Sequence, residues 1–185
     1  MKTFIFAACV LAAPVAQAQL SAIAQYDFNR QGSRSWTETA LGIAFDTEVG
    51  RVDASFIKNS GLPNQSTDAH GFELGYSTQL DTALGAVTGR VGFGRRNLID
   101  GNLGSFTAVH RYYTLSLEHS AALSSNINTF INFRHRNGLN SAPVDNRLSA
   151  GFDFSVASIT ARLGYGVTRS SSTSHGIHTS ISYNF

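Results

Sequence analysis

Glu118, His119 and Ser120 are the residues that most resemble a catalytic group, because they have the three residue types of a hydrolase triad. They are consecutive, and consecutive residues of a strand point to opposite faces, so His119 points away from both neighbours. His175 and His178 are three residues apart, which on a strand also separates them and makes a poor metal pair. We therefore predict no catalytic residue, no metal site, no cofactor and no enzymatic activity.

A second group of chemically active residues consists of charges that recur on one face of strongly alternating segments. These residues are Asp27, Glu38, Arg51, Asp53, Glu73, Arg90, Arg134 and Arg162. Glu73 and Arg90 fall in neighbouring segments, as do Glu38 and Arg51. Unpaired charges in a narrow interior are costly, so we expect these side chains to be paired or hydrated.

A third group is basic and lies around the connections between segments. It comprises Arg30, Arg34, Lys58, Arg95, Arg96, Arg136, Arg147 and Arg169. Arginine and lysine pair well with phosphate oxygens, so these residues are predicted to contact lipid headgroups, with ordinary solvation of the connections as the alternative.

The elements that carry these charges are strands. In the last segment, Ile177, Thr179, Ile181, Tyr183 and Phe185 alternate with His178, Ser180, Ser182 and Asn184. A period of two over such a length predicts a strand with one apolar and one polar face. The same pattern occurs in ten segments, at 24–29, 38–45, 51–56, 72–77, 87–93, 112–117, 129–134, 148–154, 159–167 and 176–185. We predict ten strands, with eight as the alternative if one hairpin is misread.

The connections alternate between two kinds. Long polar connections are predicted at about 31–35, 58–69, 97–104, 137–145 and 170–174, and short ones at about 46–48, 80–84, 119–125 and 155–157. All basic residues of the third group lie near the long connections, whereas acidic residues lie near the short ones.

The beginning of the chain predicts export. Lys2, an apolar stretch from Phe4 to Val15, and the small residues of Ala16-Gln17-Ala18 form a signal peptide over residues 1–18, which leaves 19–185 as one domain. The only cysteine, Cys9, lies within that peptide, so the exported chain has no disulfide. The net charge of +2 includes Lys2 and does not indicate a nucleic-acid partner.

The composition favours a membrane barrel. Charged residues make up only 14% of the chain, yet the mean hydropathy is −0.06. No segment after residue 18 approaches the roughly 20 apolar residues of a membrane helix. Low charge, average hydropathy and alternating strands together fit an all-β, antiparallel, up-and-down transmembrane barrel.

The last residues, Ile181-Ser182-Tyr183-Asn184-Phe185, resemble the terminal signature of outer-membrane β-barrels of Gram-negative bacteria. The resemblance implies a small, porin-like barrel with periplasmic termini, although it assigns no specific family. It also implies that Ile181, Tyr183 and Phe185 are contacts of the barrel assembly machinery, and that outer-membrane lipid and lipopolysaccharide surround the protein. In such a membrane, the headgroups that the basic residues of the third group are predicted to contact are those of lipopolysaccharide. The sequence leaves the oligomeric state open.

The interior of such a barrel decides the function. Small residues recur on the predicted lumen face, at Ala40, Gly42, Ala44, Gly75, Gly92, Gly151, Gly164 and Gly166, and are expected to leave space. We therefore expect a narrow passive path for ions or small solutes. The alternatives are a structural or surface-interaction barrel without a pore and, less favoured, a lipid-modifying enzyme or protease.

Overall fold

The computed structural model describes residues 19–61, 67–100, 106–139 and 144–185. The predicted signal peptide, residues 1–18, lies outside these residues, as do parts of three predicted long connections. In the described part of the chain, no helix is long and apolar enough to cross a membrane.

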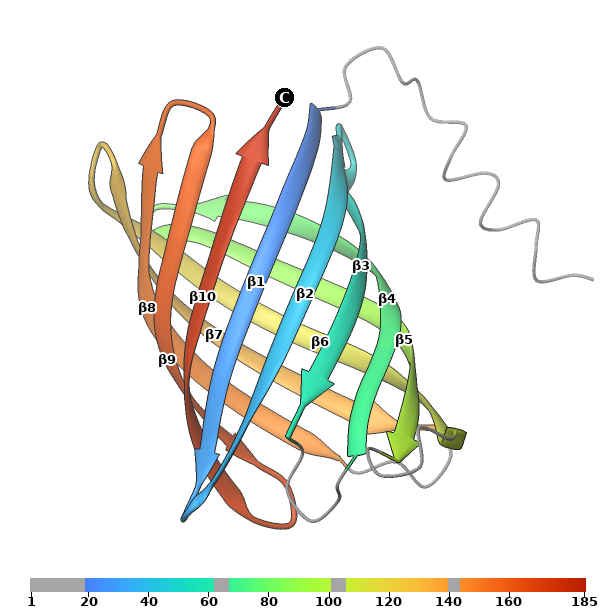
Figure 1. Cartoon of the computed structure of the whole chain (residues 1–185). Coiled ribbons are helices and arrows are strands. Elements are labelled where there is room, and N and C mark those ends of the chain that lie inside the picture. The colour runs from blue at the N-terminus through green and yellow to red at the C-terminus, as the bar shows by residue number, and fades with distance from the viewer. Residues whose placement is uncertain (1–18, 62–66, 101–105, 140–143) are drawn as a thin grey trace, which may run out of the picture.

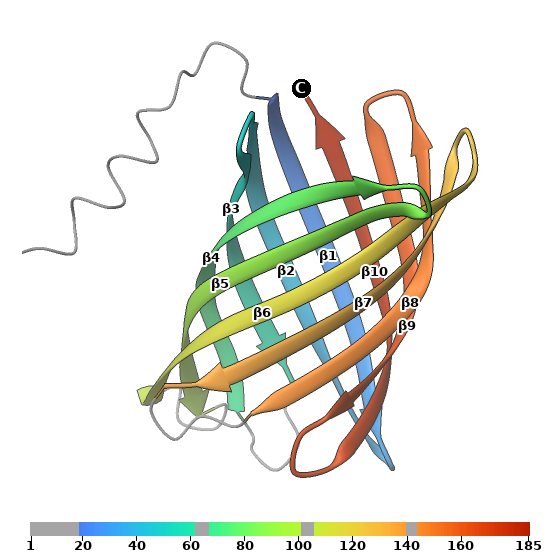
Figure 2. The same cartoon turned by 180° about the vertical axis from the view of Figure 1, so that it is seen from behind.

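The described residues form a closed barrel of ten strands, in which each strand pairs with its neighbours in sequence and β1 pairs with β10 (Figures 1 and 2). All ten pairings are antiparallel. The strands are β1 (Gln19–Gln31), β2 (Arg34–Thr47), β3 (Gly50–Ser60), β4 (Thr67–Thr82), β5 (Gly85–Asp100), β6 (Phe106–Ser124), β7 (Ile127–Gly138), β8 (Asp145–Val156), β9 (Ile159–Arg169) and β10 (Thr173–Asn184). The up-and-down barrel and the count of ten are confirmed, and the alternative of eight strands is wrong.

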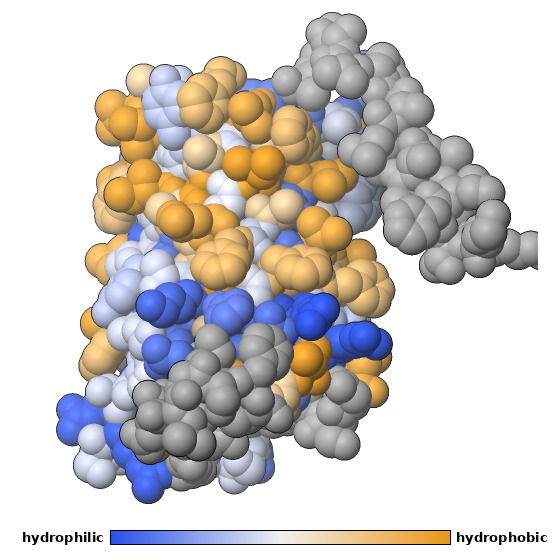
Figure 3. Space-filling model, turned by 45° about the vertical axis from the view of Figure 1, so that its right-hand side comes forward, coloured by the Kyte–Doolittle hydropathy of each residue, from blue (hydrophilic) through white to orange (hydrophobic). Residues whose placement is uncertain are grey.

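The alternation of the sequence decides which side chains face outward. Leu163 and Tyr165 of β9 are 50% and 55% exposed, whereas Gly164 and Gly166 between and beyond them are buried. The same outward position on every strand carries large apolar residues, and Figure 3 shows them covering the upper part of one face. Because the barrel is closed, its described strands leave no free sheet edge, and an apolar outer surface of this kind suits a lipid bilayer.

The two ends of the barrel differ. We call the end that holds Phe185 the turn end, because β2–β3, β4–β5, β6–β7 and β8–β9 are joined there by two-residue turns. Two of these turns share a Thr-x-x-Gly pattern, in which the hydroxyl of Thr47 donates to the carbonyl of Gly50 and that of Thr82 to Gly85, each at 2.7 Å. The opposite end is called the loop end.

Two of the five predicted long connections at the loop end are tight turns. β1 and β2 are joined by Gly32 and Ser33 alone, and β9 and β10 by residues 170–172. Gly32 adopts φ of 59°, a left-handed conformation that glycine reaches without steric cost. The strands therefore continue through half of the residues predicted for the connections at 31–35 and 170–174.

Several strands are longer than a membrane requires. β4 and β5 each have 16 residues and β6 has 19, compared with about 9–11 for a tilted membrane-spanning strand. Their loop-end parts extend beyond the apolar surface, and Figure 3 shows hydrophilic side chains gathered below it. Arg95, Arg96 and Arg111 consequently lie within strands, where the alternation of faces decides their direction.

The barrel closes along the seam between the first and last strands. Tyr26 lies opposite Thr179, and the hydroxyl of Thr179 donates to the Tyr26 carbonyl at 3.1 Å. Closer to the turn end, the hydroxyl of Ser21 donates to the Asn184 side chain at 2.7 Å, and the Phe185 amide donates to the Leu20 carbonyl at 2.9 Å. The first and last strands of the barrel therefore hold each other in place.

Candidate functional site in the barrel lumen

A cavity of about 440 Å³ occupies the interior of the barrel. Seven of the eight predicted lumen residues line it: Glu38, Arg51, Asp53, Glu73, Arg90, Arg134 and Arg162. Asp27 is 1% exposed and is held by His178, which also lines the cavity. The polar face of the barrel thus encloses a charged interior.

The middle of the lumen is organised by Arg90. Its guanidinium donates to both oxygens of Asp53, at 3.0 and 2.6 Å, and to Glu73 at 2.6 Å. The pairing of Glu73 with Arg90 matches their positions on neighbouring strands. Two carboxylates around one arginine give this cluster an excess of negative charge.

The small residues of the lumen face have a different role from the one expected. A Cβ added at Gly75 would collide with the Arg90 guanidinium, and one added at Gly92 would collide with the Thr114 hydroxyl. At Gly166, an added Cβ would lie 2.9 Å from Nε of Arg147. At these three positions, the space left by glycine is filled by neighbouring polar side chains. The expectation that Gly75, Gly92 and Gly166 leave the lumen open is therefore wrong.

A second cluster lies near the turn end around Arg162. It donates to Asp153 at 2.7 and 2.8 Å and to Glu118 at 2.8 Å, and its guanidinium lies 4.0 Å from the centre of the Phe130 ring. The Glu118 side chain therefore points into the lumen, whereas His119 is exposed on the outer face. The residues of the triad-like run Glu118-His119-Ser120 therefore do not form a catalytic unit.

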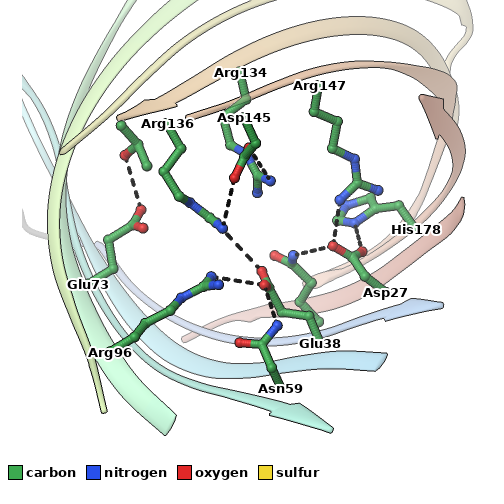
Figure 4. A network of polar contacts seen from close by, with 12 residues as sticks. Asp27, Glu38, Asn59, Glu73, Arg96, Arg134, Arg136, Asp145, Arg147 and His178 are labelled. Carbon is green, nitrogen blue, oxygen red and sulfur yellow. Dashed lines mark hydrogen bonds and ion pairs between the residues drawn. The ribbon is translucent and has the colours of Figure 1, made fainter. Parts of the chain in front are cut away.

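The arrangement nearest the loop end is the densest, and we call it the arginine layer (Figure 4). It consists of Arg96, Arg134, Arg136, Arg147, Asp27, Glu38 and Asp145. Figure 4 shows these side chains projecting from opposite walls toward one another across the lumen.

Three members of the arginine layer correct the sequence analysis. Arg96, Arg136 and Arg147 were predicted to contact lipopolysaccharide, but all three face the lumen. Their side chains are only 14%, 10% and 7% exposed, and each is paired with a carboxylate inside the barrel. Because their strands continue further than predicted, the alternation that turns Arg95 outward turns Arg96 inward.

Glu38 joins opposite sides of the arginine layer. It accepts hydrogen bonds from Arg96 of β5 and Asn59 of β3, each at 2.8 Å, and lies 3.8 Å from Arg136 of β7. Glu38 does not pair with Arg51, which instead lies opposite Asp46 and contacts it at 3.3 Å. The lateral neighbour of Glu38 is Asn59, so the expected pairing with Arg51 is wrong.

Asp27 forms the other fixed point of the arginine layer. It accepts from Arg147 of β8 at 2.6 Å and from the ring of His178 on β10. Asp145 is shared more loosely, because Arg134 and Arg136 each approach it at 3.5 Å.

Sequence reasoning missed Asn59, Tyr112, Asp145 and His178 as members of this lumen network. Tyr112 is 3% exposed, and its ring centre lies 5.3 and 5.1 Å from the guanidinium carbons of Arg96 and Arg136. The signal was present in the spacing: continuing the inward parity of β7 beyond Arg134 reaches Arg136, and Asp145 lies opposite it on β8.

The remaining basic residues of the third group lie outside the lumen. Arg30, Arg34, Lys58, Arg95 and Arg169 are exposed near the loop end. Their predicted contact with lipopolysaccharide stays a prediction. Outward-facing histidines lie in the same zone beside aromatic rings, with ring centres 6.1–6.3 Å apart. His70 stacks on Phe56 and His175 on Tyr165, whereas the ring of His135 is tilted against that of Tyr113.

The three predicted assembly residues lie at the turn end of the seam. Ile181, Tyr183 and Phe185 are 58%, 44% and 70% exposed, and the rings of Tyr183 and Phe185 meet edge to face at 4.8 Å. In the described part of the chain, no group of three or more histidine, cysteine or acidic side chains could hold a metal ion.

Comparisons with known proteins bear on the fold. No family model matches the chain, and no curated protein matches it. Among solved structures, the translocator domain of the autotransporter NalP from Neisseria meningitidis superposes with a TM-score of 0.51 at 14% identity, covering 96% of this chain and 92% of that one. The β domain of the Bordetella autotransporter BrkA gives a TM-score of 0.52 at 12% identity, covering 90% of this chain and 98% of that one.

At such identities the likeness concerns architecture alone. Both matching structures are covered nearly end to end by this chain, which closes on itself with an apolar outer face and a polar interior. This chain therefore has the fold of a bacterial outer-membrane β-barrel.

Proposed function

We propose that this protein is a narrow passive path for ions and small solutes across a bacterial outer membrane. The observation that carries the proposal is the cavity of about 440 Å³, which is lined by charged and hydroxyl side chains over much of the barrel's length. Its lining runs from Arg147 and Arg136 in the arginine layer to Thr160 and Ser182, close to the turn end. A wet, charged interior within an apolar shell is suited to polar solutes.

The arginine layer would be the narrowest part of that path. Its side chains reach across the lumen, so a solute passes only where ion pairs are long or shared, as around Asp145. Barrels of eight strands are filled by side chains and those of sixteen enclose channels, so ten strands fit a small conductance.

The test is single-channel recording after refolding the protein into a planar bilayer. Wild type is expected to give discrete, reproducible steps. Ser116→Trp places a large ring in the cavity that Ser116 lines, and is expected to reduce the step size. Leu117→Trp is the matched control, because the next residue faces outward and is 57% exposed. A folded barrel that stays silent refutes the path, as does an equal effect of the two tryptophans.

One observation favours a second candidate, a structural barrel without a pore. The arginine layer crosses the lumen with ion pairs as short as 2.6 and 2.8 Å, and an interior braced in this way could be closed to solutes. The same recording separates the two candidates, since a closed barrel gives no steps in wild type and gains none in Ser116→Trp.

We also propose that the outward basic residues at the loop end contact lipopolysaccharide phosphates. Arg95 of β5 and Lys58 of β3 are exposed, and Lys58 lies opposite His70, which stacks on Phe56. Binding of purified lipopolysaccharide to the refolded barrel should weaken in the double variant Lys58→Gln with Arg95→Gln. The single variant Arg51→Gln, which removes a lumen arginine, is the control and should bind as wild type does.

The remaining proposals concern assembly and orientation. We propose export by the signal peptide 1–18 and recognition of Ile181, Tyr183 and Phe185 by the barrel assembly machinery, both supported by the sequence at the two ends. We also propose that both termini are periplasmic, which is supported by the short turns at the end that holds Phe185. Periplasmic turns of outer-membrane barrels are short, which agrees with this orientation. Protease accessibility of a tag placed after Phe185 in intact cells tests it, since a periplasmic tag is protected.

A further inference from the structure

Unpaired hydrogen-bond donors gather in the arginine layer. Among the described side chains, the buried polar atoms without a partner are Nε of Arg96, Arg134 and Arg136, Nη2 of Arg147, the Tyr112 hydroxyl and Oδ1 of Asn59. All but the Asn59 oxygen are donors, and all lie in or directly against this one layer. Buried donors are nearly always satisfied in folded proteins, so their concentration in one place calls for an acceptor.

The charge balance of the arginine layer points the same way. Four arginines face the three carboxylates of Asp27, Glu38 and Asp145, which leaves an excess of positive charge among the described side chains. The two clusters below it have the opposite balance, because Arg90 is held by two carboxylates and Arg162 by two. His178 adds a further nitrogen against Asp27.

The least satisfied arginine lies beside another arginine. Arg134 of β7 is directly opposite Arg147 of β8, an arrangement in which like charges repel. Among the described side chains, Arg134 forms an ion pair with Asp145 alone, at 3.5 Å, and shares it with Arg136. Arg134, Arg136 and Arg147 all line the cavity, so a solute within it meets their side chains, and a small shift of these side chains turns the buried donors toward it.

We propose that the arginine layer is a binding site for an oxyanion, namely the carboxylate or phosphate group of a small solute that enters through the cavity. Its oxygens would accept hydrogen bonds from Arg134 and Arg147 and would separate their charges. Planar guanidinium groups match the oxygens of carboxylate and phosphate in geometry, and such charge-assisted bonds are the strong ones. The site rests on the proposed path, through which the solute would reach it. It adds to that function the class of solute that the narrowest part of the lumen would bind.

The experiment is a calorimetric titration of inorganic phosphate into the refolded protein in a neutral detergent at low salt. Saturable binding is expected in wild type, and sodium chloride should weaken it by screening. Arg134→Gln should reduce the affinity about tenfold or more, since a hydrogen bond to a charged group is lost. This variant keeps Asp145 paired with Arg136, so the barrel should still fold, which circular dichroism verifies.

Arg51→Gln is the matched control. It also removes one arginine that lines the cavity, but Arg51 lies close to the turn end against Asp46, away from the arginine layer. Its phosphate affinity should equal that of wild type. Displacement of phosphate by acetate would assign the site to oxyanions in general, whereas its failure would restrict the site to phosphate.

Three results overturn the inference: no phosphate binding by the folded wild type, unchanged binding in Arg134→Gln, or an equal loss in Arg51→Gln. The outcome is separable from that of the proposed path. Conductance steps without phosphate binding would overturn the oxyanion site and leave the path intact. Phosphate binding by a barrel that gives no steps would support the site and refute the path.

Discussion

Replacing Glu38 by glutamine is expected to destabilise the barrel strongly. The Glu38 side chain is 10% exposed, accepts from Arg96 and Asn59 at 2.8 Å each, and is the nearest carboxylate to Arg96. Glutamine keeps the volume and one acceptor oxygen but removes the charge, which leaves Arg96 and Arg136 facing each other across Tyr112. Removing one partner of a buried ion pair costs about 3–5 kcal/mol, and the retained hydrogen bond places the expected loss near the lower figure.

The matched control is Asp46→Asn. Asp46 and Arg51 form a looser pair at 3.3 Å, with side chains 39% and 34% exposed, and an exposed pair of this kind contributes about 0–1 kcal/mol. The free energy of unfolding can be measured by equilibrium urea titration in lipid vesicles. The fluorescence of Trp36, the single tryptophan of the chain, reports the transition from a position two residues before Glu38 in β2. If Glu38→Gln loses no more stability than Asp46→Asn, the arginine layer does not stabilise the fold and the reasoning is refuted.

Three further predictions concern other parts of the barrel. Leu163→Arg, on the apolar face at 50% exposure, should lower the free energy of unfolding in vesicles by about 2–4 kcal/mol. Thr39→Arg, opposite Lys58, should lower it by about 0–1 kcal/mol, and equal losses would contradict the proposed membrane position. Gly75→Leu should cost about 1–3 kcal/mol because its Cβ displaces Arg90, and unchanged stability would show that the lumen has spare room there. Deletion of Phe185 should slow assembly in cells, followed by pulse-chase protease protection, and assembly at the normal rate would exclude it as a recognition residue.

Alternation alone predicted the strands well where the two faces differ strongly. From 159 to 167, apolar and small or polar residues alternate without a break, and the structure has β9 from Ile159 to Arg169. The antiparallel order followed from ten such segments with short connections. The interior location of Arg90, Glu73 and Arg162 follows from the same parity and required no knowledge of the rest of the barrel.

Alternation is less informative at the loop end, where both faces of a strand are polar. In β5, Arg95, Arg96 and Asn97 follow one another, so hydropathy no longer distinguishes the lumen from the outside. The predicted strands consequently end too early, and Arg96, Arg136 and Arg147 were wrongly predicted to lie around the loops. Strand pairing settles the question through register, because Arg96 lies opposite Gly71 and follows its inward direction.

Contacts across the lumen could not be predicted at all. Arg147 and Asp27 are 120 positions apart and lie on strands that are not neighbours, so they meet only because the barrel closes with a particular diameter and stagger. Arg96 reaches Glu38 in the same way, from β5 to β2. Partners of this type depend on the curvature of the whole sheet and leave no local pattern.

The seam between β1 and β10 has a consequence for how the chain is completed. Asp27 belongs to the first strand, yet one of its two hydrogen-bond partners in the arginine layer, His178, belongs to the last. A ribosome that stops before β10 leaves both an open sheet edge and a buried carboxylate that lacks that partner. A shortened chain therefore cannot close the barrel in this way. We expect prematurely terminated products to stay unfolded and to be degraded by proteases of the cell envelope. Pairing of β10 with β1 thus distinguishes complete chains from truncated ones.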